Sequence, residues 1–112
     1  MPVKEKKPVG IFVNWTDTGV GKTMVAAGLA HYLRSRGLDV GVMKPVESGV
    51  ENPEDLGADA SLLQWAAQAE DDPQLISPYR FLLPLAPSVA AREENRKIEF
   101  TKIVEAAREL SA

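Results

Sequence analysis

The stretch "TDTGVGKT", residues 16–23, has the residue types and spacing of a phosphate-binding loop. Glycine permits backbone angles that turn successive N–H groups toward one point, and a helix start adds unpaired N–H groups and a positive dipole end. That dipole disfavours a lysine at the position of Lys22. A bound β- or γ-phosphate reverses the preference, because the lysine then neutralises anionic charge. Thr23 would offer its hydroxyl to a magnesium ion that bridges the phosphates.

The alternative interpretation is a tight turn with a solvated lysine, and the flanking pattern argues against it. An apolar segment precedes the loop and a helical pattern follows it, which is the context that a phosphate-binding loop requires. The common pattern is G-x-x-x-x-G-K-[ST], and Thr16 stands where that pattern has its first glycine. We therefore expect a variant loop rather than the form found in common nucleotide triphosphatases.

The elements around the loop predict a β–α–β unit. Residues 9–15, "VGIFVNW", are apolar on both alternating sets, which is typical of a strand buried on both faces. A helix is expected over about 22–36, with Gly37 just beyond it, and a second buried strand over 39–44. The expected apolar stripe of this helix consists of Val25, Ala26, Leu29, Ala30 and Leu33. Parallel strands aim their carboxyl ends at one crevice, so Lys44 should lie near the loop.

The rest of the chain predicts a loop followed by shorter elements. Pro45 should end the second strand, and residues 46–57 should form a polar loop in which Glu47 is solvated. Trp65 is expected to pack against the core from its helix. The expected helices cover about 60–69, 88–92 and 101–112, and a short strand is expected over about 79–82.

These elements predict an α/β fold of the P-loop NTPase-like type, with three layers around a parallel sheet. They form a single domain over residues 1–112. Two or three strands make a small sheet for this architecture, whose strands are normally covered on both faces. We therefore expect a truncated fold, the front half of a longer domain.

Composition narrows the possible functions. The chain has 112 residues, 45% of them hydrophobic and 26% charged, which is ordinary for a soluble globular domain. Its net charge of −3 gives no broad basic surface and argues against nucleic acid as a partner. The lack of cysteine excludes disulfides and thiolate chemistry and fits the cytoplasm. No apolar run is long enough to span a membrane.

Taken together, four segments closely resemble the dethiobiotin synthetase family: "TDTGVGKT", "GLDVGVMKPVESGV", "GADASLL" and "ISPYRFLLPLAPSVAAREE". The resemblance implies an ATP-dependent cyclo-ligase of biotin synthesis. In that family CO2 adds to one amine of 7,8-diaminopelargonate, ATP phosphorylates the resulting carbamate, and the second amine displaces phosphate. The resemblance also implies Mg²⁺ as a cofactor and a homodimer as the assembly.

The resemblance further implies a role for individual positions. The residues that would bind ATP and its phosphates are Thr18, Gly19, Val20, Gly21, Lys22, Thr23 and Asp59. Two of these, Thr23 and Asp59, would also hold the metal ion. Lys22 and Lys44 would be catalytic. The substrate would be contacted by Thr18, Lys44 and Ser48.

Three of these positions have plausible structural alternatives. Lys44 would, in isolation, be interpreted as a lysine that extends from a strand end into solvent. Ser48 would be an ordinary turn residue in Ser-Gly. Asp59 precedes "ASLLQWAA" and would serve well as a helix N-cap, a role that one side chain does not easily combine with metal binding.

Two features depart from the family or separate it from rivals. Trp15 stands where the family has glycine, and the family continues beyond this length into a strand that ends in a magnesium-binding glutamate. A nucleotide-switched ATPase of the partition or iron-protein type would carry a second lysine early in the loop, where this chain has Asp17. That ATPase and a catalytically silent phosphate-binding fragment remain the alternatives.

Overall fold

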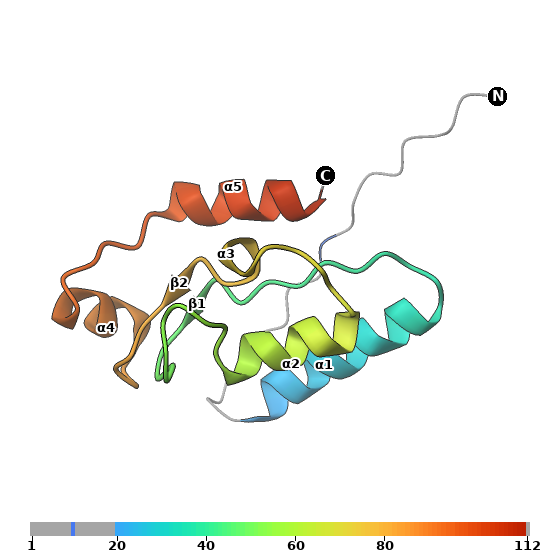
Figure 1. Ribbon diagram of the computed structural model, residues 1–112, viewed down its shortest axis with the longest axis horizontal. Coiled ribbons are helices and arrows are strands. Elements are labelled where there is room, and N and C mark those ends of the chain that lie inside the picture. Colours follow the sequence, from blue (N-terminus) through green and yellow to red (C-terminus); the bar gives the residue numbers. More distant parts are fainter. Residues whose placement is uncertain (1–9, 11–19, 112) are drawn as a thin grey trace.

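The protein is described from a computed structural model, which describes residue 10 and residues 20–111 (Figure 1). The expected first strand, apart from Gly10, and most of the phosphate loop, including Thr18 and Gly19, lie outside the described residues. The elements in chain order are α1 (Val20–Ser35), β1 (Val46–Glu47), α2 (Ala58–Ala67), α3 (Pro73–Ile76), β2 (Tyr79–Arg80), α4 (Pro87–Glu93) and α5 (Phe100–Ser111).

Helices α1 and α2 pack against each other through small side chains. Ala27 and Ala30 of α1 share one buried cluster with Leu63 and Ala66 of α2. Both helices run in the same direction in Figure 1, so their N-termini lie at the same end of the pair. Small residues at the contact let the two backbones approach closely. The packing therefore places the start of α1, which follows the loop, beside the start of α2.

The predicted helix over about 22–36 is confirmed, but its predicted stripe is only partly right. The buried positions are Thr23, Ala27 and Ala30, at helical spacing, whereas Val25 is 48% exposed. The core face is rotated relative to the prediction because the small residues, rather than the branched ones, face α2. Gly37 has φ of +85° just past the helix, as expected of a glycine C-terminal signal.

The described sheet consists of β1 and β2, which pair in parallel with Val46 opposite Tyr79 and Glu47 opposite Arg80. The short strand expected over about 79–82 is therefore confirmed at Tyr79–Arg80. The prediction that Pro45 ends a strand is wrong. Pro45 directly precedes β1 and takes part in its pairing with β2. It lacks an N–H, yet its carbonyl accepts a hydrogen bond from the Tyr79 N–H at 3.1 Å.

The strand predicted over 39–44 is wrong as a ladder element of the described structure. The segment is extended without regular pairing, and its last N–H, that of Lys44, donates to the Ile76 carbonyl at 2.7 Å. The neighbour that the β–α–β prediction gives it, residues 9–15, is described only at Gly10. A strand is assigned by its hydrogen-bonded partner strand. Among the described residues this apolar segment has no such partner, so it is not assigned as a strand.

A second buried cluster packs β2 against α4 and α5. Tyr79 and Phe81 pack with Ala90 and Ala91 of α4, and Ile103 of α5 lies against this cluster. Figure 1 shows α5 lying across α3, and the two helices are in contact. The predicted helices near 88–92 and 101–112 are therefore confirmed.

The prediction that Trp65 packs against the core is wrong. Trp65 is 76% exposed, on the outer face of α2. Leu63 and Ala66 occupy the inward positions on either side of it. Among the described helices, none combines the length and the apolarity that crossing a bilayer requires.

Candidate functional site

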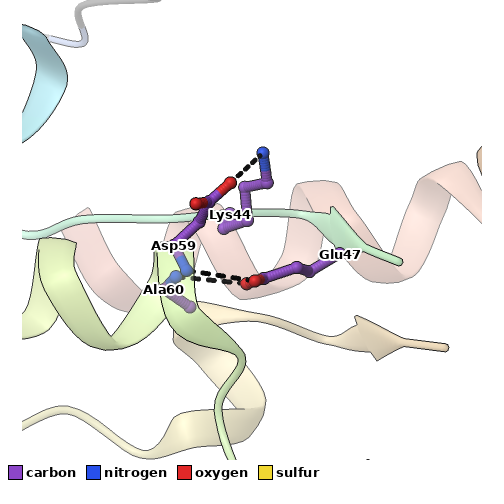
Figure 2. A network of polar contacts seen from close by, with 4 residues as sticks. All are labelled: Lys44, Glu47, Asp59 and Ala60. Atoms are coloured by element: carbon purple, nitrogen blue, oxygen red, sulfur yellow. Dashed lines mark hydrogen bonds and ion pairs between the residues drawn. The ribbon is translucent and has the colours of Figure 1, made fainter. Parts of the chain in front are cut away.

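An ion pair joins two of the predicted site residues. Nζ of Lys44 lies 3.2 Å from Oδ2 of Asp59 (Figure 2). Lys44 comes from the extended segment before β1, and Asp59 comes from the first turn of α2. The two side chains are 25% and 41% exposed, so a solute can reach the pair. Ion pairs with this exposure contribute only about 0–1 kcal/mol to stability, so another contact must fix the geometry.

That contact comes from Glu47, which is only 7% exposed. Its Oε2 accepts a hydrogen bond from the Asp59 N–H, and its Oε1 accepts one from the Ala60 N–H, each at 3.1 Å. Figure 2 shows the carboxylate reaching from β1 to the start of α2. A carboxylate suits this end of a helix because it satisfies unpaired N–H groups and the positive dipole end. Hydrogen bonds to a charged group contribute about 1.5–3 kcal/mol each, more than the exposed ion pair.

Gly57 makes this arrangement possible. It occupies the N-cap position of α2, and a Cβ built on it would overlap the Glu47 carboxylate. Its φ of −73° is open to any residue, so the requirement is for space rather than for backbone conformation. A glycine has no side chain with which to cap the helix, so the cap must come from elsewhere in the chain.

Two sequence-based interpretations are corrected here. Glu47 was expected to be a solvated loop charge, but the structure buries it as the cap of α2. The alternative interpretation of Asp59 as an N-cap is also wrong. Asp59 lies within the first turn, and Glu47 performs the capping, so the Asp59 carboxylate is available for other contacts. The signal in the sequence was Gly57 itself, because a glycine at the N-cap has no side chain that can accept a hydrogen bond from the helix.

The described part of the predicted phosphate-binding set begins the first turn of α1. Val20, Gly21, Lys22 and Thr23 all belong to that turn. Lys22 is half-buried and Thr23 is 7% exposed. Among the described residues, no hydrogen bond or ion pair links Lys22 or Thr23 to the pair on the other segment. The structure thus brings Lys44 and Asp59 together, while the α1 residues approach them only through helix packing.

Ser48 follows β1 and lies beside a turn. Its Oγ is buried and has no hydrogen-bond partner among the described residues. The next residue, Gly49, has φ of +72°, which is consistent with the alternative of an ordinary turn residue. A buried hydroxyl without a partner keeps both its donor and its acceptor capacity for a ligand or water.

The described residues fit a magnesium ion only in company with phosphate oxygens. Within the described part of the chain, no group of three or more acidic, histidine or cysteine side chains is placed so that it could hold a metal ion by itself. Thr23 offers one hydroxyl, and Asp59 offers one carboxylate of which only Oδ2 is held by Lys44. Magnesium usually takes one or two carboxylates together with substrate phosphates and water, so the hydroxyl and the carboxylate are donors of a suitable type.

Comparison with known proteins gives a consistent result. The chain is 47% identical over 103 residues to the ATP-dependent dethiobiotin synthetase of Anaeromyxobacter dehalogenans (strain 2CP-C), which covers 92% of this chain and 45% of that protein. It is 44% identical over 89 residues to the enzyme of that name from Bacillus licheniformis, covering 80% of this chain and 37% of the relative. The corresponding protein of Nitrosopumilus maritimus is 40% identical over 102 residues, with coverages of 90% and 45%.

The chain therefore spans less than half the length of these curated relatives. The resemblance to dethiobiotin synthetases predicted from the sequence is confirmed by these matches. The predicted α/β class with parallel strands is also confirmed. Because residues 9–112 match the family model described as an AAA domain, the chain belongs to that family.

Proposed function

We propose that this chain carries the nucleotide-phosphate and diamine-binding part of an ATP-dependent cyclo-ligase that makes dethiobiotin. Its substrates are 7,8-diaminopelargonate, CO2 and ATP. The observation that carries the proposal is the pairing of Lys44 with Asp59 at the start of α2, in a chain similar to proteins named for this activity.

The reaction joins the two amines of the diamine through one carbon. One amine attacks CO2 and loses a proton, which gives a carbamate. A carbamate oxygen attacks the γ-phosphorus of ATP, the bond to ADP breaks, and a mixed carbamic–phosphoric anhydride results. The second amine then attacks the carbonyl carbon, loses a proton and displaces phosphate, which closes the ureido ring. Positioning and charge stabilisation are what these steps require from a protein.

Lys44 supplies the positive charge for the carbamate. Its ammonium is fixed from behind by Asp59 and remains accessible to solvent. A carbamate placed against it would share the ammonium with Asp59, because an ammonium has three donors. Ser48, with its unpartnered Oγ, follows on the same segment and would contact the diamine. Thr18 is proposed as a further substrate contact by resemblance alone.

The first turn of α1 supplies the nucleotide end. Lys22 would neutralise the β- and γ-phosphates, and the backbone of Gly19, Val20 and Gly21 would donate N–H groups. Thr23 and Asp59 would hold a magnesium ion, which when bound neutralises phosphate charge. The parallel packing of α1 and α2 supports this grouping, since it sets both helix starts at one end. A homodimer is proposed on the same resemblance.

The switch ATPase of the partition or iron-protein type is less well supported. Asp17 stands where such a protein would carry its second lysine, and the matched relatives are named as synthetases. A silent phosphate-binding fragment has no use for a lysine held beside the helix start by an acidic partner. The pairing of Lys44 with Asp59 therefore favours the ligase.

The test is release of phosphate that depends on both diaminopelargonate and bicarbonate, with dethiobiotin identified by mass spectrometry. Activity in the complete mixture and none without the diamine is the expected result. Phosphate release that is equal with and without the diamine would support the switch ATPase. ATP binding without any phosphate release would support the silent fragment.

A further inference from the structure

We infer that Glu47 is a positioning residue that holds Asp59 opposite Lys44, and that Gly57 is its obligatory partner. For its bearing on catalysis this inference rests on the proposed function. The contact itself stands on the geometry of β1 and α2. Neither Glu47 nor Gly57 is among the site residues that the family resemblance implies.

Glu47 is tied to both of the elements that the site joins. Its backbone carbonyl accepts a hydrogen bond from the Phe81 N–H at 2.9 Å, which fixes it to β2. Its side chain accepts from the Asp59 and Ala60 N–H groups, which fixes the first turn of α2. The residue thus links the sheet to the helix through two independent sets of contacts.

Lys44 lies on the same segment, three positions before Glu47. The N–H of Lys44 donates a hydrogen bond to the Ile76 carbonyl. Asp59 is therefore joined to the Lys44 segment twice, once by the exposed ion pair and once through the buried carboxylate of Glu47. The buried contact is the stronger of the two because it is shielded from water and bidentate. The ion pair is a consequence of this anchoring rather than its cause.

Removal of the Glu47 carboxylate would leave two N–H groups without a partner at the start of α2. The Ala60 residue is fully buried, so its N–H has no access to water as a substitute. The first turn would then fray or shift, and the Asp59 side chain would move with it. Gly57 is required for the same reason, because any side chain there would displace the carboxylate.

The experiment compares Glu47→Gln with Glu51→Gln in the intact protein. Both variants remove one negative charge, and the two positions are four residues apart, but Glu51 is exposed and its side chain makes no hydrogen bond or ion pair among the described residues. The glutamine at position 47 keeps the size of the side chain and turns one acceptor into a donor, which faces an N–H. Gly57→Ala is the second variant, because it disturbs the contact from the helix side and leaves all charges in place.

Two readouts report on the contact without any catalysis. Hydrogen exchange measured by NMR should become about tenfold faster, or more, at the Asp59 and Ala60 amides of Glu47→Gln. Competitive acetylation should make Lys44 about two- to fivefold more reactive in that variant, with the exposed Lys97 as an internal reference. Glu51→Gln should match the unaltered protein in both, and in the other variants the α1 amides, which report on global stability, should be accelerated less than those of Asp59 and Ala60.

The catalytic readout is phosphate release dependent on the diamine. For Glu47→Gln, kcat should fall about tenfold or more, and the magnesium concentration for half-maximal rate should rise. Unchanged exchange at Asp59 and Ala60 would overturn the inference, as would altered exchange with unchanged Lys44 reactivity. If the unaltered protein releases no diamine-dependent phosphate, the proposed function fails, while exchange and acetylation still decide the role of Glu47. If Glu47→Gln does not fold, Gly57→Ala supplies the same comparisons.

Discussion

The carboxylate of Glu47 occupies the space into which a side chain on Gly57 would project. We expect Gly57→Ala to lower the free energy of unfolding by about 2–4 kcal/mol, because the carboxylate must move and both of its hydrogen bonds weaken. Urea denaturation checks this. An unchanged m-value would show that Gly57→Ala and the unaltered protein expose the same surface on unfolding. The matched control is Gly28→Ala in α1, where a Cβ meets nothing within 4 Å and should stabilise the exposed helix position by about 0.5–1 kcal/mol.

The destabilising effect of Gly57→Ala should disappear when the carboxylate is absent. In a Glu47→Ala background the space beside Gly57 is free, and the φ of −73° suits alanine. Gly57→Ala should then change the free energy of unfolding by less than about 1 kcal/mol, because the lower entropy of the unfolded chain offsets the poorer fit of alanine at an N-cap. A double-mutant cycle on urea midpoints measures this coupling. Additive losses would show that the two residues do not share one space.

The two lysines of the proposed site should fail in different ways. Lys22→Ala should weaken magnesium–ATP binding at least about 30-fold, because a charge that neutralises phosphate is lost. Lys44→Ala should spare much of that binding but lower diamine- and bicarbonate-dependent phosphate release by about 100-fold or more. Calorimetry measures the binding and a coupled phosphate assay measures the rate. Lys97→Ala, which removes an exposed lysine, is the control for charge alone. Equal loss of ATP binding in both variants would contradict the separate roles.

The main helices were predictable from the sequence because their signals are local. The pattern after the phosphate loop and the glycine at Gly37 define α1 within a few residues of its observed bounds. The apolar pattern around Leu63 likewise predicts most of α2. Such signals depend on neighbours three or four positions apart, which the sequence displays directly.

The predictions that were wrong concern features that depend on contacts between residues distant in sequence. Pro45 was expected to end a strand, but its carbonyl pairs with Tyr79 and begins the ladder. Glu47 was expected to be solvated, but its partners are the amides of Asp59 and Ala60, 12 and 13 positions away. Charge type alone does not reveal a buried cap of this kind. The Lys44–Asp59 pair was anticipated as two site residues by resemblance, but not as a contact.

Arg96 supports the strand against which β1 pairs, and its removal should loosen that support. Its guanidinium carbon lies 4.8 Å from the ring centre of Phe81, and its Nη1 donates to the Arg80 carbonyl at 2.8 Å. The hydrogen bond comes from a charged donor, and the ring of Phe81 adds a cation–π contact. Arg96→Ala should therefore lower the free energy of unfolding by about 1.5–3 kcal/mol.

Arg96→Lys should restore only part of this loss, because an ammonium cannot stack a planar group on the ring while donating to the carbonyl. The control is Arg92→Ala, which removes an exposed cation from the last turn of α4. Urea midpoints of the three variants give the comparison, and exchange at the Phe81 amide, which donates to the Glu47 carbonyl, reports on the sheet. A full rescue by lysine would assign the effect to charge alone. A loss no larger than that of Arg92→Ala would remove Arg96 from the contacts that hold β2, and with it β1 and the Lys44 segment, in place.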